Sequence, residues 1–94
     1  MDYMLFTPTD MIKGLADRMK SIRTRKGITR KQLAARSNVS YGSLRRFEET
    51  GKISLESFVK LAMELGLAAE INSLFTEPVY DSLEEVMNER RQKA

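Results

Sequence analysis

Cationic and small polar side chains are concentrated between Thr29 and Glu49, in a stretch that reads TRKQLAARSNVSYGSLRRFEE. Two arginines, Arg45 and Arg46, stand directly before Phe47, a residue type that usually belongs to a core. The guanidinium group of arginine pairs bidentately with phosphate and with guanine. The first chemistry that these residues indicate is therefore recognition of a polyanion.

Catalytic chemistry has little support in the same chain. The 94 residues include no His and no Cys, which removes the commonest general base and the commonest metal ligands. The neighbouring carboxylates Glu48-Glu49 and Glu84-Glu85 would diverge by about 100° around a helix, so neither pair forms an acid/base dyad. We expect no enzyme activity, no catalytic residue, no metal and no cofactor.

Charge is distributed unevenly along the chain. Twelve of the 16 Lys and Arg residues lie between Lys13 and Lys52, a range with three acids, whereas residues 53–89 hold one cation and eight acids. This asymmetry indicates one side that faces a polyanion and an acidic opposite side, although ordinary solvated helix faces would give the same count. No apolar run approaches the roughly 18 residues that cross a bilayer, so we expect a cytoplasmic protein without a membrane partner.

Helix start and stop signals recur at short intervals. Thr7 precedes Pro8, Thr29 forms a capping box with Gln32, and serines at positions 40 and 54 precede apolar runs. Glycines at 27, 51 and 66 follow those runs, as helix C-caps do. These signals predict helices over about 8–26, 30–37, 41–50, 55–65 and 68–75, and a last helix that begins near Ser82.

The apolar residues of these segments recur at helical spacing and predict one core. The side chains expected to face inward are Ile12, Leu15, Met19, Ile22, Leu33, Ala34, Val39, Leu44, Phe47, Leu55, Phe58, Leu61, Ala62, Leu65, Ile71, Leu74 and Phe75. The prediction is an all-α domain of five helices over residues 7–76, followed by a C-terminal arm over residues 77–94 that serves dimerisation or partner binding.

The second and third predicted helices are joined by only three residues, Ser37-Asn38-Val39. Each helix is too short to be stable alone, so the two must pack on their neighbours. Asn38 tolerates the left-handed conformation that a sharp turn needs, and Ala34 is small enough for close approach. This spacing is that of a helix-turn-helix.

Residues 20–66 resemble the XRE family of helix-turn-helix regulators, which includes the lambdoid phage repressors. The resemblance lies in IRTRKGITRKQLAARSNVSYGSLRRFEETGK and in the SLESFVKLAMELG that follows. It implies a lambda-repressor-like DNA-binding domain of five helices whose third helix enters the major groove, and an ion pair between Arg23 and Glu48. Two positions depart from the family pattern: Asn38, where Gly is frequent, and Arg30, where many members have Gln.

The third predicted helix supplies the candidate base-reading residues, which are polar, cationic or small and lie near its start. They are Ser40, Tyr41, Gly42, Ser43 and Arg46. Arg46 is the main candidate, since it can pair bidentately with guanine, while Gly42 would let the helix lie close to DNA or is simply a helix-start glycine. The candidate phosphate contacts are Arg25, Thr29, Arg30, Gln32, Arg45 and Lys52. For each arginine the plainer interpretation is a solvated surface residue.

These residues predict a sequence-specific regulator that binds double-stranded DNA, as a homodimeric repressor that spans two half-sites about 34 Å apart. The alternative is an antitoxin that binds a protein toxin, because the extended acidic C-terminal part is similar in architecture to antitoxins that accompany HipA-type kinases. A helical module that binds only protein is a third possibility, which the basic range from Lys13 to Lys52 disfavours. The apolar segment Tyr3–Phe6 pairs with Val79-Tyr80 in the same chain or across a dimer, or packs on its own domain.

Overall fold

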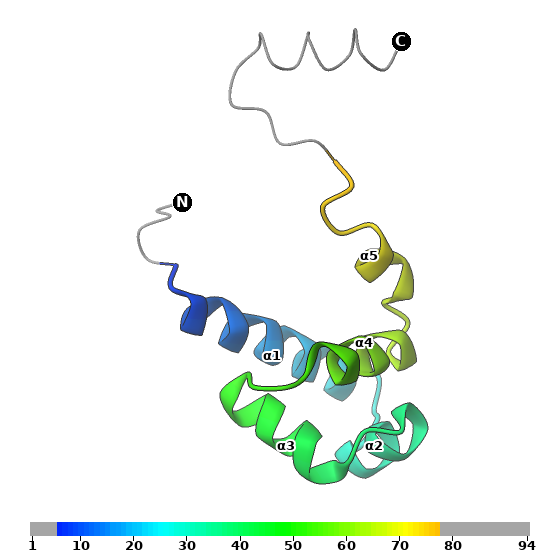
Figure 1. Cartoon of the computed structure of the whole chain (residues 1–94). Coiled ribbons are helices and arrows are strands. Elements are labelled where there is room, and N and C mark those ends of the chain that lie inside the picture. Colours follow the sequence, from blue (N-terminus) through cyan, green and yellow to red (C-terminus); the bar gives the residue numbers. More distant parts are fainter. Residues whose placement is uncertain (1–5, 78–94) are drawn as a thin grey trace, which may run out of the picture.

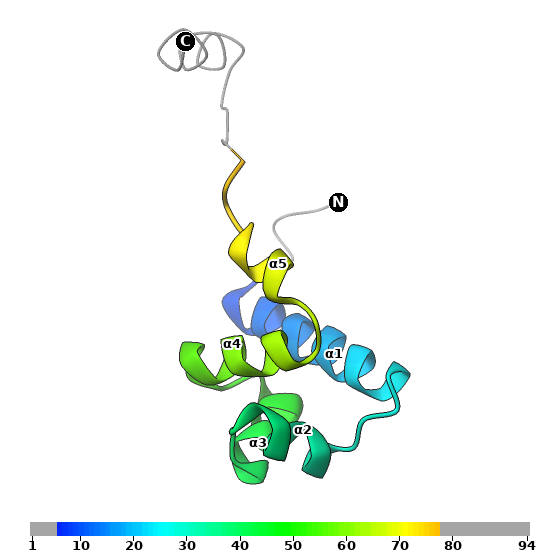
Figure 2. The ribbon, with the colours of Figure 1, turned by 90° about the vertical axis from the view of Figure 1, so that its right-hand side faces the viewer.

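The structure is a computed structural model, and it describes residues 6–77. It contains five helices and no strand within that range. They are α1 (Pro8–Arg25), α2 (Arg30–Ser37), α3 (Tyr41–Thr50), α4 (Leu55–Glu64) and α5 (Ala68–Asn72). α2 and α3 lie together at one end of the domain, and α5 lies at the opposite end (Figures 1 and 2). The all-α prediction is therefore confirmed for the described residues.

Side-chain caps begin the first four helices at the residues that the sequence predicted. The hydroxyl groups of Thr7, Thr29, Ser40 and Ser54 each accept a hydrogen bond at 3.1 Å from the backbone N–H three residues later. Each cap satisfies an N–H that the helix itself leaves unpaired. The boundaries of short helices are thereby set by local chemistry.

The turn between α2 and α3 depends on Asn38, which adopts the left-handed conformation with φ 57° and ψ 37°. Its backbone N–H donates to the carbonyl of Ala34, and so does the N–H of Val39, at 3.2 Å. Asn tolerates this conformation better than other non-glycine residues. The sharp turn brings α3 back across α2, as the helix-turn-helix spacing predicted.

A single core holds the helices together. Its buried members are Ala16, Met19, Leu33, Ala34, Val39, Leu44, Phe47, Leu61, Ala62 and Leu65. Phe47 of α3 packs edge-to-face on Phe58 of α4, with ring centroids 5.8 Å apart. Gly51 closes α3 directly against α1, and a Cβ there would lie 3.1 Å from the backbone of Ile12.

Three details of the expected core are wrong. Ile12 and Leu15 are 39% and 43% exposed, because α1 turns Ala16 inward in their place; Met19, as expected, is buried beside it. Leu55 is 77% exposed because it occupies the first position of α4, beyond the packed face.

The third error concerns α5, which ends at Asn72 and does not reach Phe75. The hydroxyl groups of Ser73 and Thr76 donate to nearby backbone carbonyls, and Phe75 has a positive φ of 61° that no α-helix contains. Phe75 is 96% exposed and Leu74 is 53% exposed. The expected helix near Ser82 and most of the 77–94 arm lie outside the described residues.

Candidate nucleic-acid interface

One face of α3 is buried and the other is exposed along the whole helix. Leu44, Phe47 and Glu48 point into the domain. The exposed side carries every residue predicted to read bases, and Arg45 as well: Ser40, Tyr41, Gly42, Ser43, Arg45 and Arg46. The domain therefore presents a surface that is polar and cationic and one helix wide, the shape that a major groove admits.

The start of α3 is ordered by hydrogen bonds between its own serines. Ser40 accepts from the backbone N–H of Ser43, and its hydroxyl donates to the Ser43 hydroxyl at 2.8 Å. Ser40 is thus occupied as a cap, whereas the Ser43 hydroxyl keeps its proton for a partner in solvent or in DNA. Gly42 has no neighbour within 4 Å of an added Cβ, so nothing in the domain itself requires a glycine there.

The two neighbouring arginines of α3 differ in their surroundings. Arg45 pairs with Glu49 one turn later, with Nε 3.1 Å from Oε1 and both side chains more than half exposed. Arg46 makes no ion pair within residues 6–77, and it lines a shallow polar hollow of about 230 Å³ together with Lys52 and the start of α4. Its guanidinium is free to meet an outside partner, so the geometry favours Arg46 over Arg45 as a base reader.

The expected phosphate contacts around α2 are partly engaged within the protein. Thr29 and Gln32 form a complete capping box, in which the Gln32 side-chain carbonyl accepts the Thr29 N–H at 2.9 Å. The Gln32 amide NH₂ group has no partner among the described residues and points outward from the start of a helix. Arg25 and Lys52 are exposed, at the end of α1 and after α3.

Arg30 has a partner that the sequence prediction missed. Its Nε donates to Glu48 Oε1 at 2.7 Å, and a hydrogen bond with Glu48, followed by one with Tyr41, raises the pKa of Arg30 above its ordinary value. The side chain therefore connects the start of α2 with Glu48 on the buried face of α3. No local pattern signals this contact, because Arg30 and Glu48 are 18 residues apart.

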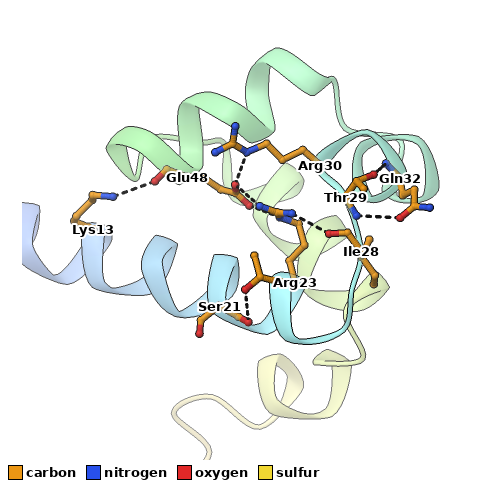
Figure 3. Close-up of polar contacts among 9 residues, drawn as sticks. Lys13, Ser21, Arg23, Ile28, Thr29, Arg30, Gln32 and Glu48 are labelled. Atoms are coloured by element: carbon orange, nitrogen blue, oxygen red, sulfur yellow. Dashed lines mark hydrogen bonds and ion pairs between the residues drawn. The ribbon is translucent and has the colours of Figure 1, made fainter.

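Glu48 is the centre of this polar cluster (Figure 3). Arg23 and Glu48, the residues expected to form an ion pair, are in contact through two hydrogen bonds, from Nε at 2.8 Å and from the second terminal nitrogen at 3.0 Å. Both side chains are buried, with exposed fractions of 9% and 2%. The remaining terminal nitrogen of Arg23 donates to the carbonyl of Ile28 at 2.8 Å.

The charge of Glu48 is maintained despite its burial. Burial opposes ionisation, but the hydrogen bonds from Arg23 and Arg30 outweigh it and hold the pKa of Glu48 below its ordinary value. Lys13 of α1 also donates to the Glu48 backbone carbonyl at 3.0 Å. Side chains of α1 and α2 thus fix the buried face of α3, and with it the direction in which the exposed face points.

Two other kinds of site are absent from the described part of the chain. No three His, Cys, Asp or Glu side chains within residues 6–77 lie together as a metal site requires. No helix in this range is long and apolar enough to cross a membrane.

A helical domain in which two short helices meet at a tight turn, the second exposing a polar cationic face, belongs to the class of helix-turn-helix DNA-binding domains. A family model described as "Helix-turn-helix" matches residues 19–71, more than half of the chain. The chain therefore belongs to the XRE-type helix-turn-helix family, and it is a DNA-binding transcription regulator. No curated protein matches the chain with significance.

Proposed function

We propose that the chain is a homodimeric repressor that binds a specific sequence of double-stranded DNA and reads the major groove with α3. The observation that carries this proposal is that the Arg46 side chain has no partner in the described part of the domain. Its guanidinium is exposed and unpaired within the described residues, on a helix whose opposite face is held by the buried Glu48 cluster. A donor that projects freely from a rigid helix suits bidentate pairing with guanine.

The surrounding residues have supporting parts in this proposal. Tyr41 and Ser43 reach neighbouring base edges or sugars, while Arg45, Gln32, Lys52 and Arg25 contact phosphates on either side of the groove. These phosphate contacts position the domain without reading sequence. The protein acts in the cytoplasm, and a homodimer spans two half-sites about 34 Å apart.

The test begins with selection from a random duplex library, followed by binding of the selected duplex at several salt concentrations. We expect a palindromic winner and an affinity that falls by about 0.9 log units per log unit of salt for each phosphate neutralised. Weak binding without any enriched sequence would contradict the proposal.

A matched pair of variants locates the reading residue. Arg46→Ala and Arg45→Ala remove the same charge from the same exposed face of α3. We expect Arg46→Ala to lose about 1–3 kcal/mol of discrimination at one base pair. Arg45→Ala should weaken binding to all duplexes alike. Equal loss of discrimination in both variants would show that Arg46 is not the base reader.

The alternative is an antitoxin with the same DNA-binding domain and a protein toxin as its main partner. The acidic character of residues 53–89 supports it, because a cationic partner would be attracted to that part of the chain. A kinase-like reading frame beside the gene, and co-purification of its product with the full chain, would favour this alternative over a repressor that acts alone.

A further inference from the structure

The described surface contains an apolar face that the DNA-binding role leaves unused. It is formed by the first half of α1 and the segment after α5, around a hollow of about 620 Å³. Met11, Leu15, Leu74 and Phe75 line the hollow, with exposed fractions of 59%, 43%, 53% and 96%. α5 lies at the end of the domain away from α2 and α3 (Figures 1 and 2), so a partner on this face leaves α3 free for DNA.

The charged residues at the rim of this hollow are complementary to the same residues of a second copy. Asp10 and Arg18 both line it, and neither forms an ion pair within residues 6–77. They stand four residues before and four residues after Gly14 on α1. If two copies of α1 pack antiparallel about a two-fold axis at Gly14, Asp10 of each copy faces Arg18 of the other.

Gly14 permits the close approach that this arrangement needs. An added Cβ would meet only the far end of the Arg18 side chain, at 3.2 Å, so no rigid group of the domain covers the glycine. Helices that cross at a small residue approach to the lower end of the usual 8–10 Å range. Met11 and Leu15 then meet their counterparts across the axis.

Phe75 supplies a projecting group beside this hollow. Its backbone has φ 61°, an uncommon conformation for a large residue, and its side chain is 96% exposed. A knob and a hollow on the same face are self-complementary, which is the property of an isologous two-fold interface.

We propose that this face is the homodimer interface, with α1 paired antiparallel about Gly14, reciprocal ion pairs between Asp10 and Arg18, and Phe75 inserted into the partner. The proposal rests on the homodimer of the proposed function and adds its location. Dimerisation is measured without DNA, so a failure here is distinguishable from a failure of DNA recognition.

The experiment reverses each rim charge in the full chain and measures mass by sedimentation across a range of protein concentrations. Asp10→Arg leaves each copy with a cation at both rim positions, and Arg18→Asp leaves each copy with an acid at both. Because two symmetry-related pairs change from attraction to repulsion, we expect either variant to dimerise about thirty-fold more weakly than the wild type. Lys20→Asp, a reversal on another face of α1, is the matched control and should dimerise normally.

Mixing the two variants provides the decisive measurement. Asp10→Arg and Arg18→Asp chains are complementary to each other, so an equimolar mixture should form heterodimers of wild-type affinity. Phe75→Ser should weaken the dimer of the wild-type background without changing the helical circular dichroism, since the ring is almost fully exposed.

A wild-type chain that stays monomeric up to about 100 µM, a range far above that of specific complexes, would overturn the proposal. So would a wild-type dimer that both reversals leave intact, or reversals whose mixture fails to restore association. Restoration in the mixture, together with a normal Lys20→Asp dimer, would support it.

Discussion

Removal of one partner from the Arg23–Glu48 pair should cost far more stability than removal of both. The perturbation is a cycle of Glu48→Leu, Arg23→Met and the double variant. In Glu48→Leu, Arg23 remains buried with a charge and no counterion. Breaking a buried pair in this way costs about 3–5 kcal/mol, whereas apolar replacement of both partners is often nearly neutral.

The structure sets how the cost divides among the variants. Arg23→Met leaves Glu48 with Arg30, whose side chain is 28% exposed, so this loss should lie near the lower end, at about 3 kcal/mol. The Ile28 carbonyl loses its Arg23 donor in both the single and the double variant, so that loss cancels from the cycle. With single losses of about 3–5 and about 3 kcal/mol and a nearly neutral double variant, the coupling energy should be about 6–8 kcal/mol. This is a large part of the roughly 5–15 kcal/mol that stabilises a domain.

The assay is urea unfolding followed by far-ultraviolet circular dichroism. The midpoint should fall by more than 1 M urea in each single variant and recover in the double variant. Arg45 and Glu49 provide the control cycle, because they form an exposed pair one turn apart on the same helix, expected to couple by about 0.3–0.5 kcal/mol. A coupling between Arg23 and Glu48 no larger than this control would refute the reasoning.

Three further perturbations test the same structure. The pKa of Glu48 is lower in the folded than in the unfolded chain. Its contribution to the free energy of unfolding is therefore present above the ordinary value of 4.5 and is lost as pH falls through the folded pKa. Urea midpoints measured from pH 6 to pH 3 should fall more steeply for the wild type than for Glu48→Gln. Gly51→Ala should destabilise more than Gly27→Ala in thermal unfolding, since both have positive φ but only at Gly51 does an added Cβ meet the backbone of Ile12; equal losses would contradict the close packing. Asn38→Val should lower the free energy of unfolding by about 1–2 kcal/mol, whereas Asn38→Gly should lower it little or not at all. Equal losses in the two variants would show that the left-handed turn is absent in solution.

Local chemistry made much of the fold predictable. Thr29 with Gln32 and the caps at Ser40 and Ser54 are signals within four residues, and each marks the helix start that the structure has. Asn38 was predicted to adopt the left-handed conformation because few residue types tolerate it. Such features depend on a residue and its nearest neighbours, which the sequence shows directly.

Contacts between distant segments were harder to predict from the sequence. The Arg23–Glu48 pair was expected only from the family resemblance, and nothing near Arg30 indicated that it also reaches Glu48. The face of α1 was misjudged by about one position, because Leu15 and Ala16 both fit an apolar stripe and only the packed neighbours decide between them. The exposure of Phe75 has the same origin, since periodicity does not reveal where a terminal helix ends.

The Glu48 cluster links the core of the domain to the orientation of α3. Glu48 occupies the buried face of α3, so one carboxylate ties α3 to Arg23 of α1 and to Arg30 of α2. Tyr41, at the start of the exposed face, also contributes to the raised pKa of Arg30, so the influence of the cluster extends from the core towards a residue proposed to meet DNA. A rigid reading helix requires fixed supports, and positions that touch no base therefore affect recognition through the angle at which α3 leaves the domain. Arg30→Gln keeps a donor but removes the charge. We expect it to change the DNA sequence selected from the random library and to have a smaller effect on the stability of the domain. An unchanged selection would show that the cluster has only a structural role.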